Sequence, residues 1–313
     1  MKILHIAMGS PEIDRAAVDL GHEVRRIAWR DILGRKPTPR DAERLQSTIV
    51  DMATEFLPDL VFIQTHQSEV VHPQTLFDMR SLGAFVVFWV GDVREPLPEY
   101  YLRIAPHVDV MAFSNLTDVE LMRGAGFRSE YLQIGYDPDI YNPGDGTQSR
   151  RGIVFLGNNY GDQFPNGPLR LQVLERMRNE FGRLMTIRGA RWPWPNTNPT
   201  TPEEEVELYR GAQIALNIDH FTRPGFWSDR LLRAMACGCM VVDVGARCTD
   251  PTPQDAVDCV RAMLGQDRIV TAGNTNAQWA LEHHTWRSRI RTMENWVNGI
   301  PDNGKTGPIL AEQ

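Results

Sequence analysis

The feature that most constrains the fold of this chain is a repeated alternation of short apolar runs with longer amphipathic stretches. In the first half, five runs rich in Val, Ile and Phe have the length of strands buried on both faces; they are residues 2–8, 23–29, 59–65, 84–90 and 108–114. Segments such as 40–56 and 73–82 lie between them and have the length of crossover helices. This alternation predicts a parallel, doubly wound α/β sheet.

The same pattern restarts after residues 141–152, which are rich in Pro, Gly and polar residues, as an interdomain linker is. The second half contains four further predicted strands and four predicted helices. The strands are residues 152–157, 183–189, 212–219 and 239–244, and the helices lie near 167–180, 202–210, 228–237 and 253–264. A chain of 313 residues has room for two such domains.

The C-terminal region has a different character. Residues 274–298 carry apolar side chains at helical spacing and predict one or two amphipathic helices. We therefore expect an N-terminal Rossmann-like domain over residues 1–145 and a C-terminal one over 146–273. A helical segment and tail over 274–313 would follow.

Composition narrows the function classes. Hydrophobic residues make up 42% of the chain and charged residues 23%, which argues against global disorder. No apolar run is long enough to span a bilayer, and the run at residues 3–8 is too short for a signal peptide. We therefore expect a cytoplasmic protein with no membrane partner. The net charge of −7 argues against general attraction to nucleic acid, although residues 25–44 carry a local net charge of +4.

The four cysteines lie close together, at Cys237, Cys239, Cys248 and Cys259. Their spacing lacks the paired C-x-x-C of common zinc modules. Reduced, mostly buried thiols are the expected state, and no bound metal is predicted.

In open parallel sheets, ligands bind beyond the carboxyl ends of the strands, so the loops after the strands are the first candidates. With two sheets, the natural ligand site is the cleft between them. The loop Gly157–Gly161 follows the first strand of the second half, and its glycines let backbone N–H groups approach a phosphate. Neither this loop nor residues 8–11 matches G-x-G-x-x-G, which argues against a dinucleotide site. A tight strand-to-helix turn is the alternative interpretation of each loop.

The segment 217–243 is the most informative. A strand ends near Asp219, Ser228 or Asp229 can cap the next helix, and Arg230 lies in its first turn. A helix N-terminus with an arginine suits a diphosphate. The alternative is an arginine that only solvates the helix end.

The run from Arg230 to Gly238, followed by CMVVD, resembles the donor-site motif of GT-B glycosyltransferases, nearest the CgeB-type spore-protein glycosyltransferase-like group. Further pieces resemble that group in the expected order: residues 135–138 with 141–143, 154–158, 188–189 with Trp192, and 285–289. The resemblance implies two Rossmann-like domains facing across a cleft, with the C-terminal helix packing back toward the N-terminal domain. It also implies a nucleotide-sugar donor, most often a UDP-sugar, held by the C-terminal domain, with no cofactor and no metal.

The chain departs from the family pattern at one point. Retaining relatives commonly carry two Glu in this motif, and the matching positions here are Gly225 and Arg233. A guanidinium only donates hydrogen bonds, so Arg233 cannot accept those of ribose hydroxyls. Asp229 or Asp219 would have to replace the missing acceptor. An inactive nucleotide-sugar-binding or structural protein of the same fold is therefore the first alternative.

The predicted donor-binding residues combine this loop and motif. They are Gly157, Asn158, Asn159, Arg188, Trp192, Asp219, Asp229, Arg230 and Arg233. Arg188 and Trp192 are placed near the nucleotide base by the resemblance alone, and a rigid packing role is the alternative for Trp192.

The catalytic and acceptor residues are sought in loops of the first half. Asp92 follows a buried strand and is the candidate base, with a salt bridge to Arg94 or a helix cap as the alternative; His66 is the rival base. Gly9, Ser10, Arg30 and Arg35 are the predicted acceptor-side residues.

The basic segment 25–44 would suit DNA with a hydroxymethylated base as acceptor, or it is simply a solvated helix face. Protein, glycan and small-molecule acceptors stay open, and so does the choice between hexosyl and pentosyl transfer. An epimerase or dehydrogenase is the remaining alternative function, and the missing G-x-G-x-x-G argues against it.

Overall fold

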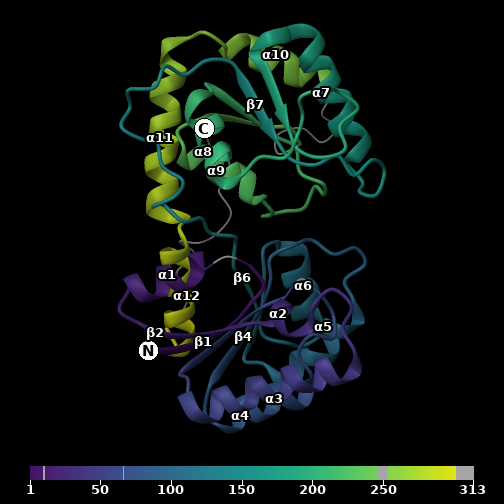
Figure 1. Cartoon of the computed structure of the whole chain (residues 1–313), viewed down its shortest axis with the longest axis vertical. Coiled ribbons are helices and arrows are strands. Elements are labelled where there is room, and N and C mark those ends of the chain that lie inside the picture. Colours follow the sequence, from purple (N-terminus) through teal and green to yellow (C-terminus); the bar gives the residue numbers. More distant parts are fainter. Residues whose placement is uncertain (10, 66, 246–251, 301–313) are drawn as a thin grey trace. The chain divides into compact units, whose positions relative to one another are not determined.

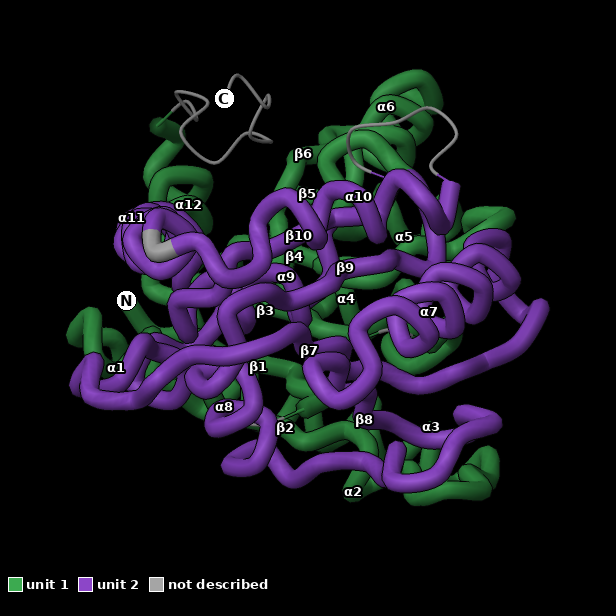
Figure 2. The backbone as a smooth tube through the Cα atoms, turned by 90° about the horizontal axis from the view of Figure 1, so that it is seen from above, with its two compact units in different colours: residues 1–135, 223–226, 286–313 green, residues 136–222, 227–285 purple. Residues whose placement is uncertain are grey.

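The computed structural model describes residues 1–9, 11–65, 67–245 and 252–300. The chain forms two compact units, coloured separately in Figure 2. Unit 1 comprises Met1–Gly135, Arg223–Phe226 and Trp286–Gln313, and unit 2 comprises Tyr136–Thr222 and Trp227–Thr285. The division into three parts predicted from the sequence, with boundaries at 145/146 and 273/274, stays a prediction.

Unit 1 contains a six-stranded sheet in which every pair is parallel, in the order β2-β1-β3-β4-β5-β6. The strands are β1 (Lys2–Ala7), β2 (Glu23–Ala28), β3 (Leu60–Gln64), β4 (Phe85–Val90), β5 (Val110–Phe113) and β6 (Ser129–Tyr131). The helices are α1 (Glu12–Asp19), α2 (Trp29–Leu33), α3 (Pro39–Phe56), α4 (Pro73–Ser81), α5 (Glu99–Ile104), α6 (Leu116–Gly124) and α12 (Trp286–Val297), with a 3-10 turn at Ala105–His107. The predicted parallel α/β sheet is confirmed.

Both faces of this sheet are covered. Val86 and Phe88 of β4 pack into a core with helices α2 to α6, and Val87 and Trp89 of the same strand pack with α1 and α12. Alternate residues of a strand point to opposite faces, which is why the strand is apolar throughout.

Helix α12 belongs to unit 1 although it lies at the far end of the sequence, and it packs beside α1 (Figure 1). Arg287 donates to Asp19 at 2.5 Å, and the Trp286 ring meets Trp89 edge-on. Arg289 is fully buried and donates to the carbonyl oxygens of Gln133 and Ile134. The expected return of the C-terminal helix to the N-terminal domain is confirmed.

Unit 2 contains a four-stranded parallel sheet in the order β10-β9-β7-β8. Its strands are β7 (Ile153–Leu156), β8 (Met185–Arg188), β9 (Ile214–Asn217) and β10 (Met240–Asp243). Its helices are α7 (Gly167–Phe181), α8 (Pro202–Gly211), α9 (Asp229–Ala236), α10 (Pro253–Met263) and α11 (Asp267–His283), with a 3-10 turn at Gly182–Leu184. Helices α7 and α10 cover one face, and α8, α9 and α11 cover the other (Figure 1).

The strand order of unit 2 singles out one place for a ligand. The chain leaves β7 toward β8 on one side and later returns to β9 on the other. Such a reversal opens a crevice beyond the carboxyl end of the first strand. The loops after β7 and β9 are therefore the structural candidates for the site.

One local expectation about a helix start needs correction. Ser228 precedes α9 but does not cap it, because its hydroxyl donates to Asn217 Oδ1 at 2.8 Å. In the described part of the chain, the helices lack either the length or the apolar character needed to traverse a bilayer.

Candidate functional site

The loop after β7 is held firmly against the loop after β8. Gly157 N donates to the Arg188 carbonyl at 2.8 Å, and Asn158 Oδ1 accepts from Ala190 N at 2.8 Å. A Cβ on Gly189 would lie 2.0 Å from the Gly157 carbonyl oxygen. The loop therefore has a fixed shape that depends on a glycine at position 189.

Arg170 lies in the first turns of α7, the helix that follows this loop, and is 2% exposed. Its guanidinium lies 5.3 Å from the centre of the Phe155 ring, and Nη1 meets the imidazole of His220. Within the described residues, Nε and Nη2 have no hydrogen-bond partner. Burial, reinforced by the charge of Arg230, lowers the pKa of Arg170 to about 9. An arginine with two unpaired buried donors is costly unless an anion binds there.

Arg230, in the first turn of α9, lies beside the same loop. Its Nη2 is 3.4 Å from Asp219 Oδ1, and its Nε is buried without a partner among the described residues. A Cβ on Gly157 would lie 3.0 Å from Arg170 Nη2 and 3.5 Å from Arg230 Cδ. Both arginines therefore reach over Gly157, and we call Arg170 and Arg230 the arginine pair.

The arginine pair has a carboxylate and an imidazole as close neighbours. Asp219 is the carboxylate that contacts Arg230, and burial raises its pKa although Arg230 opposes the shift. His220 adds no positive charge at neutral pH, since burial and the two neighbouring guanidinium groups lower its pKa to about 3. Asp219 pairs with Arg230 and Asp229 lies close to it, but three guanidinium nitrogens of the arginine pair have no hydrogen-bond partner among the described residues, which suits a phosphate.

Arg233 is one turn further along α9 and does not face solvent freely. Its Nη1 lies 3.2 Å from Asp229 Oδ2 and 3.3 Å from Glu205 Oε1, and its guanidinium lies over the Tyr141 ring. Burial raises the pKa of Glu205, although Arg233 opposes the shift. Position 233 lacks the Glu of the family pattern, but Asp229 and Glu205 place two carboxylates beside it that can accept hydrogen bonds.

Trp192 lies deeper than the sequence suggested. It is 7% exposed, its Nε1 donates to the Gly157 carbonyl at 2.7 Å, and its ring stacks on Trp194 with an interplanar angle of 4°. These contacts fit the packing alternative, in which Trp192 supports the loop. Arg188 is half-buried and lies at the end of β8, where its carbonyl accepts from Gly157.

The candidates of unit 1 lie on different loops. Asp92 follows β4, its side chain is 51% exposed, and its Oδ2 lies 3.3 Å from Arg94, as the salt-bridge alternative expected. The Gly9 carbonyl accepts from Arg26. Ser10 and His66 lie outside the described residues.

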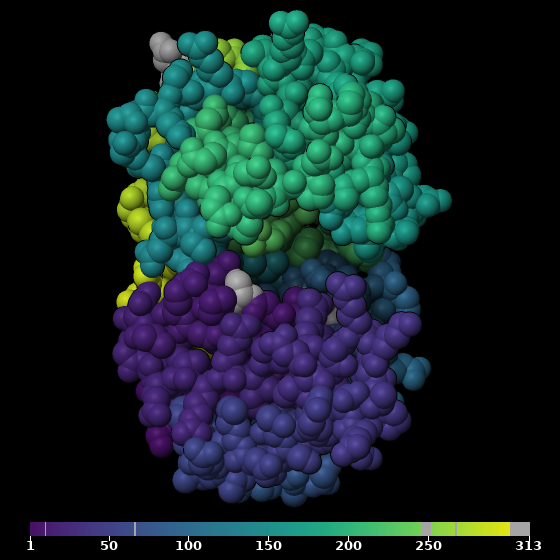
Figure 3. All heavy atoms as spheres, in the orientation of Figure 1, coloured from purple at the N-terminus to yellow at the C-terminus, as the bar shows by residue number. Residues whose placement is uncertain are grey.

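Two arginines of the basic segment 25–44 have carboxylate partners outside it. Arg25 pairs with Glu55 and Arg26 with Asp14. Arg30 is exposed beside the Trp29 ring, and Arg35 is exposed in the loop before α3. The segment contributes to the surface of unit 1 seen in purple and indigo in Figure 3.

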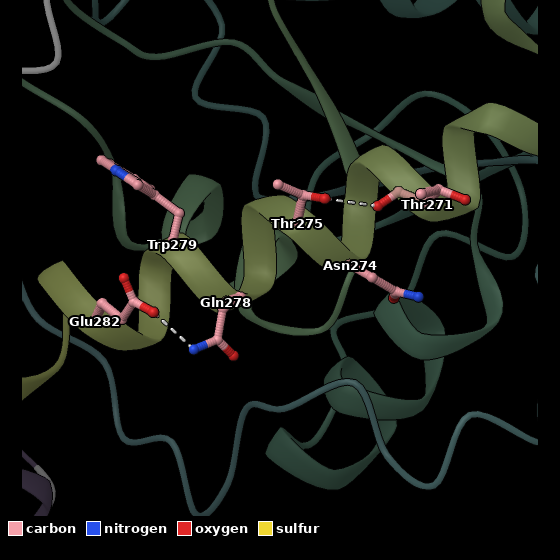
Figure 4. A pocket seen from close by; sticks show the side chains of 6 residues that line it. All are labelled: Thr271, Asn274, Thr275, Gln278, Trp279 and Glu282. Atoms are coloured by element: carbon pink, nitrogen blue, oxygen red, sulfur yellow. Dashed lines mark hydrogen bonds between the residues drawn. The ribbon is translucent and has the colours of Figure 1, made fainter.

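A separate open hollow of about 540 Å³ lies along α11 (Figure 4). Its lining comes from one face of that helix: Thr271, Asn274, Thr275, Gln278, Trp279 and Glu282. Gln278 donates to Glu282 and Thr275 donates to the Thr271 carbonyl, so these polar groups satisfy one another.

Cys237 and Cys239 are free and fully buried, and burial raises the pKa of the Cys237 thiol to about 12. Cys259 is half-buried, and Cys248 lies outside the described residues. Among the residues that the structure describes, no three His, Cys, Asp or Glu side chains are grouped to hold a metal ion.

Sequence reasoning found Gly157, Asp219, Asp229 and Arg230, and the structure brings these residues together. It missed Arg170, His220 and Glu205, which the fold adds from α7, the loop after β9, and α8. One signal was available for Arg170. It lies in the first turns of the helix that follows the glycine-containing loop, a common place for a phosphate ligand.

Residues 170–295 match the model of a family described as glycosyl transferase-like. No curated protein matches the chain. The C-terminal part of the chain, from Arg170 through most of α12, is thus glycosyl transferase-like in sequence.

The chain resembles solved structures over nearly its whole length. A glycosyltransferase from Rickettsia africae ESF-5 is 11% identical, with a TM-score of 0.61 over 96% of this chain and 99% of that one. An E. coli structure described as trehalose-6-phosphate bound with UDP-2-fluoro glucose is 11% identical, with a TM-score of 0.60 over 96% and 100%. The S. aureus MnaA–UDP co-structure is 10% identical, with a TM-score of 0.55 over 96% and 98%. These similarities show that the chain has the GT-B fold.

Proposed function

We propose that this protein is a glycosyltransferase that moves a sugar from a nucleoside-diphosphate sugar to a hydroxyl acceptor. The observation that carries the proposal is the arginine pair, in which three buried nitrogens beside Gly157 have no partner in the described part of the chain. Departure of a nucleoside diphosphate develops negative charge, and fixed donors in a water-poor site stabilise it. Guanidinium groups suit this role because their planar donors match phosphate oxygens. The arginine pair would therefore take the place of a metal ion.

The other donor contacts follow from position. We assign the diphosphate to Arg170, Arg230 and the backbone of the loop Gly157–Asn159. Asp219, Asp229 and Glu205 are the carboxylates at hand to accept from sugar or ribose hydroxyls, which Arg233 cannot do. Arg188 remains the residue proposed to contact the nucleotide base of the donor. A UDP-sugar is the proposed donor because two of the similar structures hold UDP or a UDP-sugar analogue.

On the acceptor side, we propose Asp92 as the base that takes the proton of the acceptor hydroxyl. Arg94 keeps this carboxylate in place. Gly9, Arg30 and Arg35 are proposed to contact the acceptor. Because Arg30 and Arg35 are exposed, hydroxymethylated DNA belongs in the acceptor panel beside glycans, peptides and small alcohols.

The test is release of nucleoside diphosphate from a panel of nucleotide sugars, with product masses read for each acceptor. Arg170→Met and Arg230→Met should each lower the rate at least about a hundredfold, the scale for losing one donor to a developing anion. Arg176→Met is the matched control on α7, because Arg176 is exposed and its hydrogen bond goes to Gln254, away from the arginine pair. Its rate should equal that of the unmodified protein.

The alternatives give different results. Tight UDP binding without turnover for any acceptor would favour an inactive binding protein. Isomerised nucleotide sugar without nucleotide release would favour an epimerase, and either result would refute the transfer reaction.

A further inference from the structure

His220 is placed against the arginine pair by aromatic packing. It follows β9, and its ring lies 4.5 Å from Phe164 and 5.2 Å from Tyr160, measured between ring centres. Its Nδ1 is 2.6 Å from Arg170 Nη1, and its Nε2 contacts the same nitrogen. Arg170 of α7 and Arg230 of α9 are the charged groups that face it, and Tyr160 is the titratable group in the loop after β7. The imidazole is thus held in one position from two sides.

Arg170 has few other restraints. Its Nη1 meets His220, its flat face lies over Phe155, and its Nε and Nη2 are unpaired among the described residues. The nearby Arg230 repels it. A guanidinium in this position would turn away from Arg230 unless a fixed acceptor held it, since arginine has several rotatable bonds.

We propose that His220 is the positioning residue of the arginine pair: its neutral imidazole accepts from Arg170 Nη1 and so directs Nε and Nη2 of Arg170 toward the bound diphosphate. The identity of the diphosphate ligand rests on the proposed function. The property that His220 would control is the affinity of the site for a pyrophosphate group. His220 itself need not touch the ligand.

The charge state of the imidazole supports this role. Burial, Arg170 and Arg230 together lower the pKa of His220 to about 3, so the ring stays neutral at physiological pH. A neutral imidazole offers one nitrogen as an acceptor, whereas a protonated one offers none and would add a third positive charge. Asp219, the carboxylate on Arg230, is opposite in sign but does not outweigh the two guanidinium groups.

The test measures the affinity of inorganic pyrophosphate and of UDP by calorimetry for three variants. His220→Phe keeps the ring against Phe164 but removes the acceptor, and it should weaken both ligands about tenfold. His220→Asn places an oxygen close to the Nδ1 position and should restore affinity to within about threefold. Phe164→Leu disturbs the packing but leaves the acceptor, so it should weaken binding less than His220→Phe does. Circular dichroism melts check that each variant is folded.

A second readout is independent of ligand. In an NMR titration, the His220 ring should show no transition between pH 5 and 8 in the unmodified protein. It should titrate at higher pH in Arg170→Met, because one of the two neighbouring charges is gone.

The outcomes separate this inference from the proposed function. If His220→Phe binds pyrophosphate as tightly as the unmodified protein, or Phe164→Leu is equally weakened, the positioning role is overturned. Absence of pyrophosphate binding in the unmodified protein would overturn it as well. Weakened pyrophosphate binding in His220→Phe, with no sugar transfer from any donor, would uphold the positioning role and refute the glycosyltransferase.

Discussion

Replacing Arg170 by methionine should stabilise the ligand-free protein while removing its anion site. Burial lowers the pKa of Arg170 from its ordinary value to about 9, and at 1.36 kcal/mol per pKa unit the buried charge costs about 5 kcal/mol at neutral pH. Two contacts offset part of this cost. The hydrogen bond to His220 contributes about 2 kcal/mol and the contact with the Phe155 ring about 1 kcal/mol.

The difference gives the expected effect. Methionine has a similar length and packs well on aromatic rings, so the variant should gain about 2 kcal/mol in free energy of unfolding at pH 7. Because the folded-state pKa lies below the unfolded one, the penalty is complete below pH 9 and is relieved as pH rises above the folded-state pKa toward the unfolded one. The advantage of the variant should therefore shrink by about 1 kcal/mol at pH 10.

The assay is urea unfolding followed by hydrogen exchange in peptides from β7 and α7. A local probe is needed because a chain of two units does not have one defined unfolding free energy. Pyrophosphate at a hundred times its dissociation constant should stabilise the unmodified protein by about 2.7 kcal/mol and the variant far less. A loss of more than about 1 kcal/mol in ligand-free Arg170→Met, or no change of its advantage with pH, would refute the reasoning.

Three further predictions concern the frame around the site. Gly189→Ala should destabilise unit 2 by about 3 kcal/mol, because its Cβ would lie 2.0 Å from a carbonyl oxygen; Gly211→Ala, with open space around it, is the control in a thermal melt. Arg289→Met should cost unit 1 about 3 kcal/mol by leaving the buried Gln133 carbonyl and the half-buried Ile134 carbonyl without this donor, and exposed Arg291→Met should cost under about 0.5 kcal/mol in the same melt. Cys239 should stay unlabelled by iodoacetamide at pH 8.5 until urea is added, since burial raises its thiol pKa; labelling of the native protein, read by peptide mass spectrometry, would contradict this.

The elements of this protein could be predicted because their signals are local. Residues 153–156 are apolar and buried on both faces, as the run 152–157 indicated, and α8 begins with the capping box of Thr201 and Glu204. Apolar periodicity, caps and glycine turns each act over a few residues. The same is true of the loop Gly157–Asn159, whose glycine and position after a strand predict a ligand-binding loop.

The partners within the site could not be predicted in this way. Arg170 and His220 are 50 residues apart, and they meet because β7 and β9 are neighbours in the sheet. Glu205 reaches Arg233 from another helix. Arg233 replaces a Glu of the family pattern, and this departure was the reason to consider an inactive protein. The structure places carboxylates beside it. The burial of Trp192 could not be predicted either, because the local sequence is the same whether a tryptophan in a proline-rich loop packs in the core or contacts a ligand.

The sequence by itself determined the strands, the helices, the parallel α/β class and the loops at which a ligand can bind. Only the tertiary structure decided which charges lie side by side, which of them lack partners among the described residues, and therefore where an anion is needed. The reason is physical. Backbone preference and apolar periodicity are properties of neighbouring residues, whereas the free energy of a buried charge depends on groups that strand order and helix packing bring close.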